Sequence, residues 1–421
     1  MKFFLIGIKG SGMSALANIL LDDGYQIRGC DTSNFVNTEV NLKRRNVIID
    51  SFEEKEFLNS DLIIIGHSFY NEKLINLLNQ NSKAYFEYNE FLDLYLDSNK
   101  LVCISGSHGK TTLVKMLSNS FPSCSYLCGE GQGKKRENDN FFFLEACEYK
   151  RHFLKYHPQE IFITNIDYDH VDYFKTESDY INSFNEFASL SKKVYCLYQY
   201  RNLISHSNVI TYGLDKDADY HIEYLDQNGG FLVSFYHKNE LIHKFSIDRK
   251  PDHYLELLCA NLAFYHQHNY DLDVILNNLK DFSLPFQRFN FETFNNQVIV
   301  KDYCHHPTQI NYNLEQCNLY YKNYKKVAIF RPDRTSRLVF FKDKFISELE
   351  KYDYAFVLPL SHTEEINGHS SKELETNKIH FVDKINDISK FLNFKEKFVF
   401  SFMSSKDLSD DIFSLKHILN N

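Results

Sequence analysis

The feature that most constrains the fold is a strand, a glycine turn and a helix that follow one another at residues 101–112. Residues 101–105 are mostly apolar and partly β-branched, which predicts a buried strand. A turn with a glycine at each end, Gly106 and Gly109, comes next, and Lys110-Thr111-Thr112 opens a helix with one apolar face. Such a unit binds phosphate, because glycines let backbone N–H groups converge on an oxyanion and the helix N-terminus adds partial positive charge. We expect Lys110 to reach the terminal phosphates of a nucleotide and the Thr111 hydroxyl to bind Mg²⁺.

The turn is shorter than the general phosphate-loop pattern, which has a glycine where this chain has Ile104. A sequence of the form G-x-x-G-K-T also fits an ordinary turn and helix cap. Spacing alone therefore leaves two interpretations open, a phosphate loop and a structural turn.

Length and charge restrict the class of protein. A chain of 421 residues is expected to form two or three domains. The net charge of −9, with no long basic run, argues against a nucleic-acid partner, and the lack of an 18-residue apolar stretch argues against a membrane span. The apolar N-terminal run ends at Lys9 without a cleavage site, so no signal peptide is expected. Nine scattered cysteines are typical of reduced thiols in a cytoplasmic protein.

The N-terminal segment predicts a β-α-β unit. A strand at residues 2–7 leads into a glycine loop, a helix runs from Met13 to about Asp22, and a strand at 25–30 ends at Asp31. The pattern is similar to a dinucleotide-binding loop, except that Lys9 stands where backbone must approach a pyrophosphate. Either the Lys9 side chain meets a phosphate itself or the loop is a plain tight turn. A further strand at 61–65 ends in Gly66-His67-Ser68, so a parallel sheet is expected with these loops at its carboxyl edge.

Two predicted strands of the middle section end in acidic or histidine-bearing segments. The strand at 141–144 leads into Glu145, and the strand at 161–165 leads into His170. In a parallel sheet these side chains are expected to converge beside the phosphate loop, where a Mg²⁺–triphosphate site needs oxygen ligands. Each residue taken singly also fits a structural role. Residues 208–247 read as short strands of an antiparallel appendage.

The α/β alternation resumes beyond Arg288, with polar residues gathered at two strand ends, 302–306 and 331–337. The pair His305-His306 has no third ligand at metal spacing, so the sequence predicts no metal site there. Arg334 and Arg337 are suited to a carboxylate or a phosphate, or to the solvated start of a helix.

These motifs, in this order, resemble those of the Mur ligase family. The matching segments are residues 7–14 (GIKGSGMS), 106–112 (GSHGKTT), 145–154 (EACEYKRHFL), 164–170 (TNIDYDH), 288–289 (RF), 302–308 (DYCHHPT) and 330–337 (FRPDRTSR). They extend over all three expected domains. The segment 145–154 is the most diagnostic, because the sister ligases of the family do not share it.

The resemblance implies an ATP- and Mg²⁺-dependent amide ligase of α/β class. Its three domains would be a Rossmann-like UDP-sugar-binding domain (1–97), a P-loop ATPase-like domain with an antiparallel appendage (98–284) and a Rossmann-like amino-acid-binding and closure domain (285–421). The implied activity joins L-alanine to the carboxylate of UDP-N-acetylmuramate through an acyl phosphate, in cytoplasmic peptidoglycan precursor synthesis. Monomer and homodimer both stay open.

The resemblance also implies roles for individual residues. Lys110, His170 and Arg288 are expected to be catalytic, and Thr111, Glu145 and His170 to bind the metal ion. The other expected ligands are Gly106, Ser107, His108, Gly109, Lys110, Thr111, Thr112 and Asp302 for ATP; Gly7, Lys9, Gly10, Ser11, Gly12, Met13, Asp31, His67 and Ser68 for the UDP-sugar; and His305, His306, Arg334 and Arg337 for the substrate carboxylate or the amino acid.

Three departures from the family pattern keep other interpretations open, one of which is Lys301, where an acidic residue usually stands. Tyr254 and Leu257 stand where the family has two asparagines, and residues 404–407 (SSKD) replace a late Gly-Ala-Gly-Asp motif. One alternative is a catalytically degenerate protein that binds nucleotide or UDP-sugar, and another is the related ligase that attaches a recycled peptide to the same sugar. A nicotinamide oxidoreductase is suggested only by the first glycine loop, and both Lys9 and the second nucleotide site speak against it.

Overall fold

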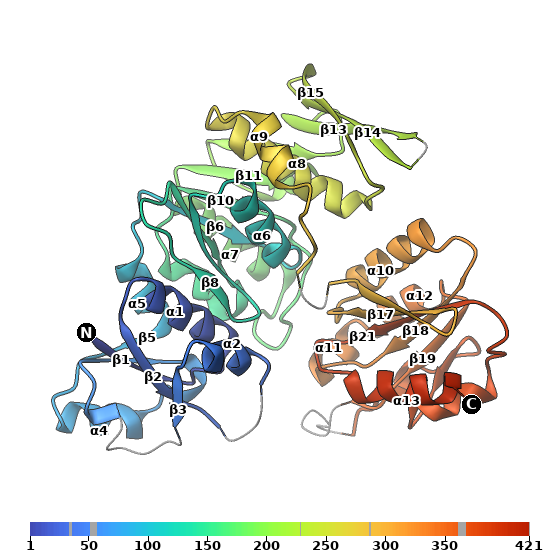
Figure 1. Cartoon of the computed structure of the whole chain (residues 1–421), viewed down its shortest axis with the longest axis horizontal. Coiled ribbons are helices and arrows are strands. Elements are labelled where there is room, and N and C mark those ends of the chain that lie inside the picture. Colours follow the sequence, from blue (N-terminus) through green and yellow to red (C-terminus); the bar gives the residue numbers. More distant parts are fainter. Residues whose placement is uncertain (33–35, 51–56, 228, 286–287, 361–367, 421) are drawn as a thin grey trace.

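A computed structural model describes residues 1–32, 36–50, 57–227, 229–285, 288–360 and 368–420. These residues form three α/β units that follow one another along the chain, each built on its own sheet (Figure 1). Each unit, a sheet with its helices, is called a layer below. Among the described residues, no helix combines the length and the apolar composition that crossing a membrane requires.

The first sheet is parallel throughout, with strand order β3-β2-β1-β4-β5. Its elements are β1 (Lys2–Ile6), α1 (Ser11–Asp22), β2 (Gln26–Cys30), α2 (Thr38–Arg44), β3 (Ile48–Asp50), β4 (Leu62–Ile65), α4 (Glu72–Gln80), β5 (Tyr85–Glu87) and α5 (Tyr88–Tyr95). The predicted strands β1, β2 and β4 and the first helix are confirmed. The edge strands β3 and β5 were not predicted, because three half-exposed residues carry no periodic signal.

The second sheet has the order β15-β14-β13-β12-β11-β10-β6-β9-β7-β8 among its described strands. It contains β6 (Leu101–Ser105), α6 (Lys110–Ser120), β7 (Cys124–Cys128), β8 (Gln132–Lys134), β9 (Phe141–Glu145), β10 (Glu160–Ile163), α7 (Glu177–Ser189), β11 (Lys193–Leu197), β12 (Val209–Gly213), β13 (Tyr220–Gln227), β14 (Gly230–His237), β15 (Glu240–Ile247), α8 (Asp252–Gln267) and α9 (Leu272–Asn278). Strands β9 and β10 flank β6 in parallel, so the segments that follow all three meet at one edge, as predicted. The antiparallel strands β13–β15 extend this sheet through β12.

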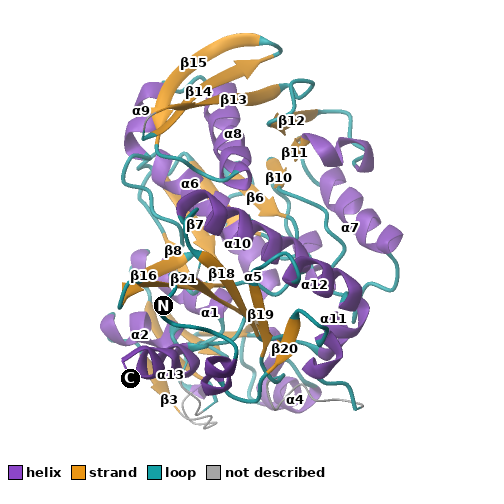
Figure 2. Cartoon of the chain, turned by 90° about the vertical axis from the view of Figure 1, so that its right-hand side faces the viewer, coloured by secondary structure: helices purple, strands orange, loops and turns teal. Residues whose placement is uncertain are grey.

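The third sheet has the order β16-β17-β21-β18-β19-β20, parallel except for β16. Its elements are β16 (Asn290–Phe294), β17 (Gln297–Asp302), α10 (Pro307–Tyr320), β18 (Lys325–Phe330), α11 (Thr335–Phe340), α12 (Lys342–Leu349), β19 (Tyr354–Val357), β20 (Ile379–Phe381), β21 (Phe398–Met403) and α13 (Ser409–Asn420). Figure 2 shows this layer facing the viewer, and Tyr312 of α10 stacks on His253 of the central layer.

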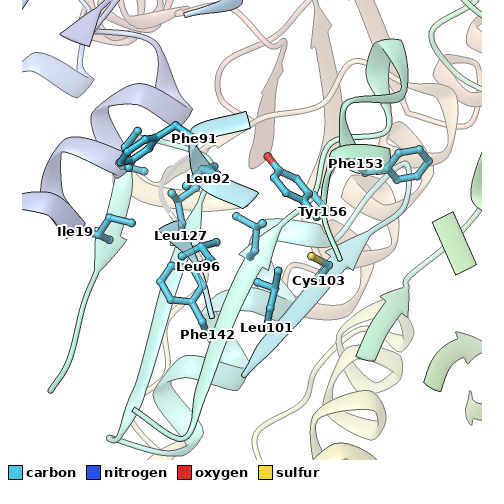
Figure 3. Close-up of a cluster of buried hydrophobic side chains, with 14 of the residues drawn as sticks. Ile19, Phe91, Leu92, Leu96, Leu101, Cys103, Leu127, Phe142, Phe153 and Tyr156 are labelled. Atoms are coloured by element: carbon cyan, nitrogen blue, oxygen red, sulfur yellow. The ribbon is translucent and has the colours of Figure 1, made fainter. Parts of the chain in front are cut away.

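The joint between the first two layers is apolar. A buried cluster that includes Ile19, Phe91 and Leu92 of the first layer and Leu127 and Phe142 of the second runs through it (Figure 3). Helix α1 also lies directly on β8, where a Cβ at Gly133 would come within 2.3 Å of the Ala15 carbonyl oxygen. Only glycine permits this approach of helix and strand.

Helix α8 is apolar on nearly its whole circumference, which is typical of a helix enclosed by protein. Its fully buried Phe264 contacts the rings of Phe143, Phe162 and Tyr195 on the central sheet, with centroids 5.5, 5.8 and 6.0 Å away. These rings pack α8 against strands β9, β10 and β11 of the central sheet.

We predict that Phe264→Ala lowers the free energy of unfolding by about 3–5 kcal/mol, because it leaves a cavity among three packed rings. Phe264→Leu should cost less than half of that, since it retains most of the buried volume. Urea unfolding, followed by far-ultraviolet circular dichroism, measures the free energy of unfolding of both variants. Equal losses for the two variants would contradict a well-packed site.

Candidate active site

A cleft of about 1080 Å³ opens where the three layers meet. From the first layer, all nine residues expected to bind a UDP-sugar line it: Gly7, Lys9, Gly10, Ser11, Gly12, Met13, Asp31, His67 and Ser68. From the other layers come Ser107, His108, Gly109, Lys110, Thr111, Glu145, Glu148, His170, Arg288, His305, Arg334 and Arg337. Segments more than 300 residues apart in sequence thus share one solvent-filled space.

The glycine turn after β6 has a backbone that only glycine adopts without strain. Gly106 has φ +136°, and a Cβ there would come within 2.2 Å of the Thr164 hydroxyl; Gly109 has φ +80°. The end of β10 holds the turn in place, since the His108 N–H donates to Asn165 Oδ1 (2.8 Å) and the Thr164 hydroxyl donates to the His108 carbonyl (2.5 Å). The turn opens directly into α6, the geometry of a phosphate-binding loop.

Lys110 lies in a buried network of charges. Its ammonium donates to Glu148 Oε2 (3.0 Å) and to the Gly106 carbonyl, and His170 Nε2 lies 3.1 Å from Glu148 Oε1. Burial alone would raise the pKa of Glu148, but Lys110 and His170 lower it to about 2. Burial opposes the charge of Lys110, yet the Glu148 carboxylate raises the pKa of this lysine. Both groups are therefore charged at neutral pH.

Thr111 and Glu145 bring two oxygen donors together beside the turn. The Thr111 hydroxyl donates to Glu145 Oε2 (2.9 Å), and the Gly129 N–H donates to the same oxygen (2.7 Å). Hydroxyl and carboxylate oxygens are the ligands that Mg²⁺ prefers, so the donor set fits this ion. His170 Nε2 is engaged by Glu148, and within the described chain its buried Nδ1 has no hydrogen-bond partner.

The first glycine loop holds Lys9 in a defined position. The Lys9 N–H donates to Asp31 Oδ2 (2.7 Å), and its ammonium lies 3.0 Å from Glu39 Oε2 and donates to the Thr32 carbonyl (3.0 Å). The charge of Lys9 is thus compensated by Glu39 in this structure. A phosphate at this loop would face the N-terminus of α1, while direct contact with the Lys9 side chain requires exchange with Glu39.

The C-terminal layer contributes two arginines that differ in burial and in their ion-pair partners. Buried Arg337 donates from Nε and Nη2 to the carboxylate of Asp169 (3.0 and 3.1 Å) and from Nη1 to both oxygens of Asp333 (2.8 Å each). Arg334 is more exposed, lying over the Tyr149 ring and 3.4 Å from Asp172. Arg334 is therefore better available to a substrate anion than Arg337.

The histidine pair also divides into two environments. His305 lines the cleft, whereas His306 caps α10, with its Nδ1 accepting the Thr308 N–H (3.4 Å), and packs against His108 of the phosphate loop. Burial, followed by the nearby His108, lowers the pKa of His306 to about 3.

A smaller cavity of about 90 Å³ adjoins the phosphate loop on the side of α8. It is lined by His108, Gly109, Thr112, Thr164, Asn165, Leu197, Tyr212, His253, Tyr254, Glu256, Leu257, Leu284, Arg288, Phe289, Asp302, Tyr303, Gln309, Tyr312 and Gln316. Asp302 accepts from Asn313 Nδ2 (2.9 Å) and from the Phe289 N–H (3.1 Å). Arg288 lies over the Tyr303 ring, and its buried Nε finds no partner among the residues that the structure describes.

Sequence reasoning missed four carboxylates that position the expected residues: Glu148, Asp167, Asp169 and Asp333. Glu148 and Asp169 lie inside the motifs at 145–154 and 164–170, where their spacing from Glu145 and His170 was a usable signal. Their partners, Lys110 and Arg337, are 38 and 168 residues away, and no local pattern could reveal those pairs.

Two family models match the chain. The model described as "Mur ligase family, catalytic domain" matches residues 2–93, and the "Mur ligase middle domain" matches residues 132–256. The UDP-N-acetylmuramate–L-alanine ligase of Streptococcus pneumoniae is 29% identical over 435 residues, which cover 100% of this chain and 98% of that protein.

Solved structures agree on the fold. The UDP-N-acetylmuramate–alanine ligase of Thermotoga maritima superimposes with a TM-score of 0.79 at 20% identity, covering 100% of this chain and 98% of that chain. The murein peptide ligase of Psychrobacter arcticus gives 0.68 at 17% identity, covering 100% and 99%. The arrangement of three α/β layers is therefore that of the three-domain ligases.

We predict that Glu148→Gln destabilises the chain by about 3 kcal/mol, because it leaves the Lys110 charge buried without its counter-ion. The double variant Lys110→Met/Glu148→Gln should recover part of that loss, since no unpaired charge remains. Urea unfolding of the wild type, of the single variants Glu148→Gln and Lys110→Met and of the double variant completes the cycle. Additive losses would show that the two charges do not interact.

We also predict a pH effect from His253, which stacks on Tyr312 of α10 with ring centroids 4.6 Å apart. Burial lowers the pKa of His253 to about 4, below its value in the unfolded chain. Its contribution to stability is therefore complete above pH 6.5 and declines by about 1 kcal/mol per pH unit as the pH falls toward 4. His253→Phe keeps the stacked ring without the titration, so thermal unfolding should lose that part of its pH dependence. An unchanged slope would exclude His253 as the source.

Proposed function

The chain belongs to the Mur ligase family, and we propose that it joins L-alanine to the carboxylate of UDP-N-acetylmuramate with hydrolysis of ATP. The observation that supports this best is the single cleft in which the Lys110 loop, the Thr111–Glu145 pair and the Gly7–Met13 loop face residues of the third layer. The similarity to the Streptococcus pneumoniae ligase extends over 100% of this chain and 98% of that protein, which supports the proposal.

We assign one substrate to each layer. Residues 1–97 hold the UDP-sugar, with its diphosphate at the loop from Gly7 to Met13 and at the start of α1. Residues 98–284 hold ATP on the turn from Gly106 to Thr112, and its nucleoside extends toward the smaller cavity with Asp302. Residues 285–421 close over both and receive the amino acid beside His305 and Arg334.

The first chemical problem is charge. A substrate carboxylate must attack the γ-phosphate, and both groups are anionic. Lys110 and the N-terminus of α6 offset the repulsion, and Glu148 keeps Lys110 protonated and pointed along the turn. Thr111, Glu145 and His170 would hold Mg²⁺, which neutralises phosphate charge when bound.

The second problem is water. Attack of the carboxylate on the γ-phosphate releases ADP and leaves an acyl phosphate, and attack by the alanine amine then forms the amide and releases phosphate and a proton. Because an acyl phosphate hydrolyses readily, the third layer must cover the cleft during this step. The Arg337–Asp169 and His306–His108 contacts join that layer to the central one, which supports such a closure.

Two other functions remain as outcomes to be tested. Tyr254 and Leu257 place an aromatic ring and an aliphatic side chain in the wall of the smaller cavity, where the family has two asparagines. The loss of these side-chain amides favours weakened catalysis or a protein that binds nucleotide without turnover. The peptide-recycling ligase shares the fold, as the Psychrobacter arcticus structure indicates. We expect a cytoplasmic enzyme, because its proposed nucleotide substrates are cytoplasmic, and either a monomer or a homodimer.

We predict phosphate release only when ATP, Mg²⁺, UDP-N-acetylmuramate and L-alanine are all present. Lys110→Met should lower the rate at least 100-fold, because it removes the charge that offsets the repulsion between the anions. Coupled ADP and phosphate assays with a panel of amino acids and the tripeptide measure both effects. Faster turnover with the tripeptide would favour the recycling ligase, and tight ATP binding without turnover would favour the degenerate protein.

A further inference from the structure

Three potential metal ligands from distant parts of the chain meet at the joint between the central and C-terminal layers. His108 belongs to the phosphate loop, Asp167 follows β10, and His306 precedes α10. His108 Nε2 lies 3.2 Å from His306 Nδ1 and 3.4 Å from Asp167 Oδ2, and all three ligand atoms lie within 4.8 Å of one another. We call this group the His108 cluster.

The spacing within the His108 cluster suits a small divalent ion. Metal–nitrogen bonds of about 2.0–2.1 Å in a tetrahedral site put neighbouring ligand atoms about 3.4 Å apart. Two of the three separations are already close to this value, at 3.2 and 3.4 Å, and a modest movement of Asp167 or His306 completes three ligands around one point, with His306 Nδ1 exchanging its long contact to the Thr308 N–H for the ion. A water molecule would supply the fourth.

The side chains of the His108 cluster are also buried and held in fixed orientations, as expected of metal ligands. His108 and His306 are 5% and 4% exposed, and Asp167 Oδ2 is buried with no hydrogen-bond partner in the described part of the chain. The Tyr200 hydroxyl donates to Asp167 Oδ1 (2.6 Å), which fixes the carboxylate with its other oxygen toward His108. The edge of the His306 ring meets Phe341, which limits its rotation. Such outer contacts orient ligands in metal sites.

We propose that the His108 cluster binds one zinc-class transition-metal ion, which clamps the C-terminal layer onto the phosphate loop. Two imidazoles and one carboxylate select Zn²⁺ or Co²⁺ over Mg²⁺, which takes oxygen ligands and belongs at Thr111 and Glu145. His306 lies 198 residues from His108, which is why the spacing of His305-His306 alone predicted no metal site.

The test uses the untagged full-length protein after dialysis against a chelator. Titration with CoCl2 should produce the strong visible absorption of a four- or five-coordinate ion, saturating at one equivalent, and ZnCl2 should displace it. Calorimetry with ZnCl2 gives the affinity. Amide hydrogen exchange should slow at residues 303–310 when Zn²⁺ is added, because the clamp joins that segment to the central layer.

The variants separate this site from its neighbours. His306→Asn keeps a residue that can cap α10 but removes the imidazole, and it should weaken Zn²⁺ binding at least 100-fold. His305→Asn is the matched control, since it removes the adjacent, half-buried histidine outside the His108 cluster, and it should leave the affinity within about threefold. Glu145→Gln should likewise leave the cobalt absorption unchanged.

Asp167→Asn provides an independent loss of one ligand should His306→Asn fold poorly, and the zinc X-ray absorption spectrum of the wild type should show two imidazole ligands. The proposal is overturned if Co²⁺ gives only weak octahedral absorption, if His305→Asn and His306→Asn weaken binding equally, or if Glu145→Gln abolishes the signal. None of these outcomes depends on ligase turnover, so the proposed activity and this site can fail separately.

Discussion

Lys110 places a positive charge in a part of the cleft that little water reaches, and the Glu148 carboxylate is the counter-charge that stabilises it there. An isolated buried ammonium would lose its proton or destabilise the fold, because burial in a low-dielectric site disfavours charge. Glu148 lies only 1% exposed and is itself held by His170, so the network is satisfied on both sides. The phosphate loop can therefore present a fixed charge to an incoming anion without reorganising.

Local chemistry determined which parts of this protein could be predicted. The turn from Gly106 to Gly109 was recognisable because each glycine meets a backbone requirement that no other residue fulfils. The alternation of strands and helices predicted a parallel sheet, and the observed order β10-β6-β9 brings Glu145 and His170 to the same sheet edge. Strand β3 and the hydrogen bonding of Lys9 to Asp31 did not follow, because both are set by tertiary neighbours.

The candidate site shows the same division between local and long-range information. Resemblance assigned Arg334 and Arg337 one shared role, yet the structure gives them different surroundings: Arg337 is enclosed by two carboxylates and Arg334 remains partly exposed. The pairing of Arg337 with Asp169 joins residues on different sheets, and it depends on how two layers are placed, which no motif encodes. The position of Tyr254 and Leu257 relative to the phosphate loop is likewise known only from the structure, in which both line the cavity beside Gly109.

The joint between the N-terminal and central layers and the joint between the central and C-terminal layers differ in the contacts that hold them. Ile19, Leu127 and Phe142 give the first joint an apolar core, whereas Arg337, Asp169 and His306 hold the second joint through polar contacts. Dissolved ions screen exposed charge pairs, such as Arg334 with Asp172 across the second joint, but hardly reach the buried pair of Arg337 and Asp169, while strongly hydrated anions such as sulfate strengthen apolar contact. Added salt is therefore expected to weaken the exposed rim of the joint between the central and C-terminal layers, while the buried Arg337–Asp169 pair and the apolar core of the other joint persist.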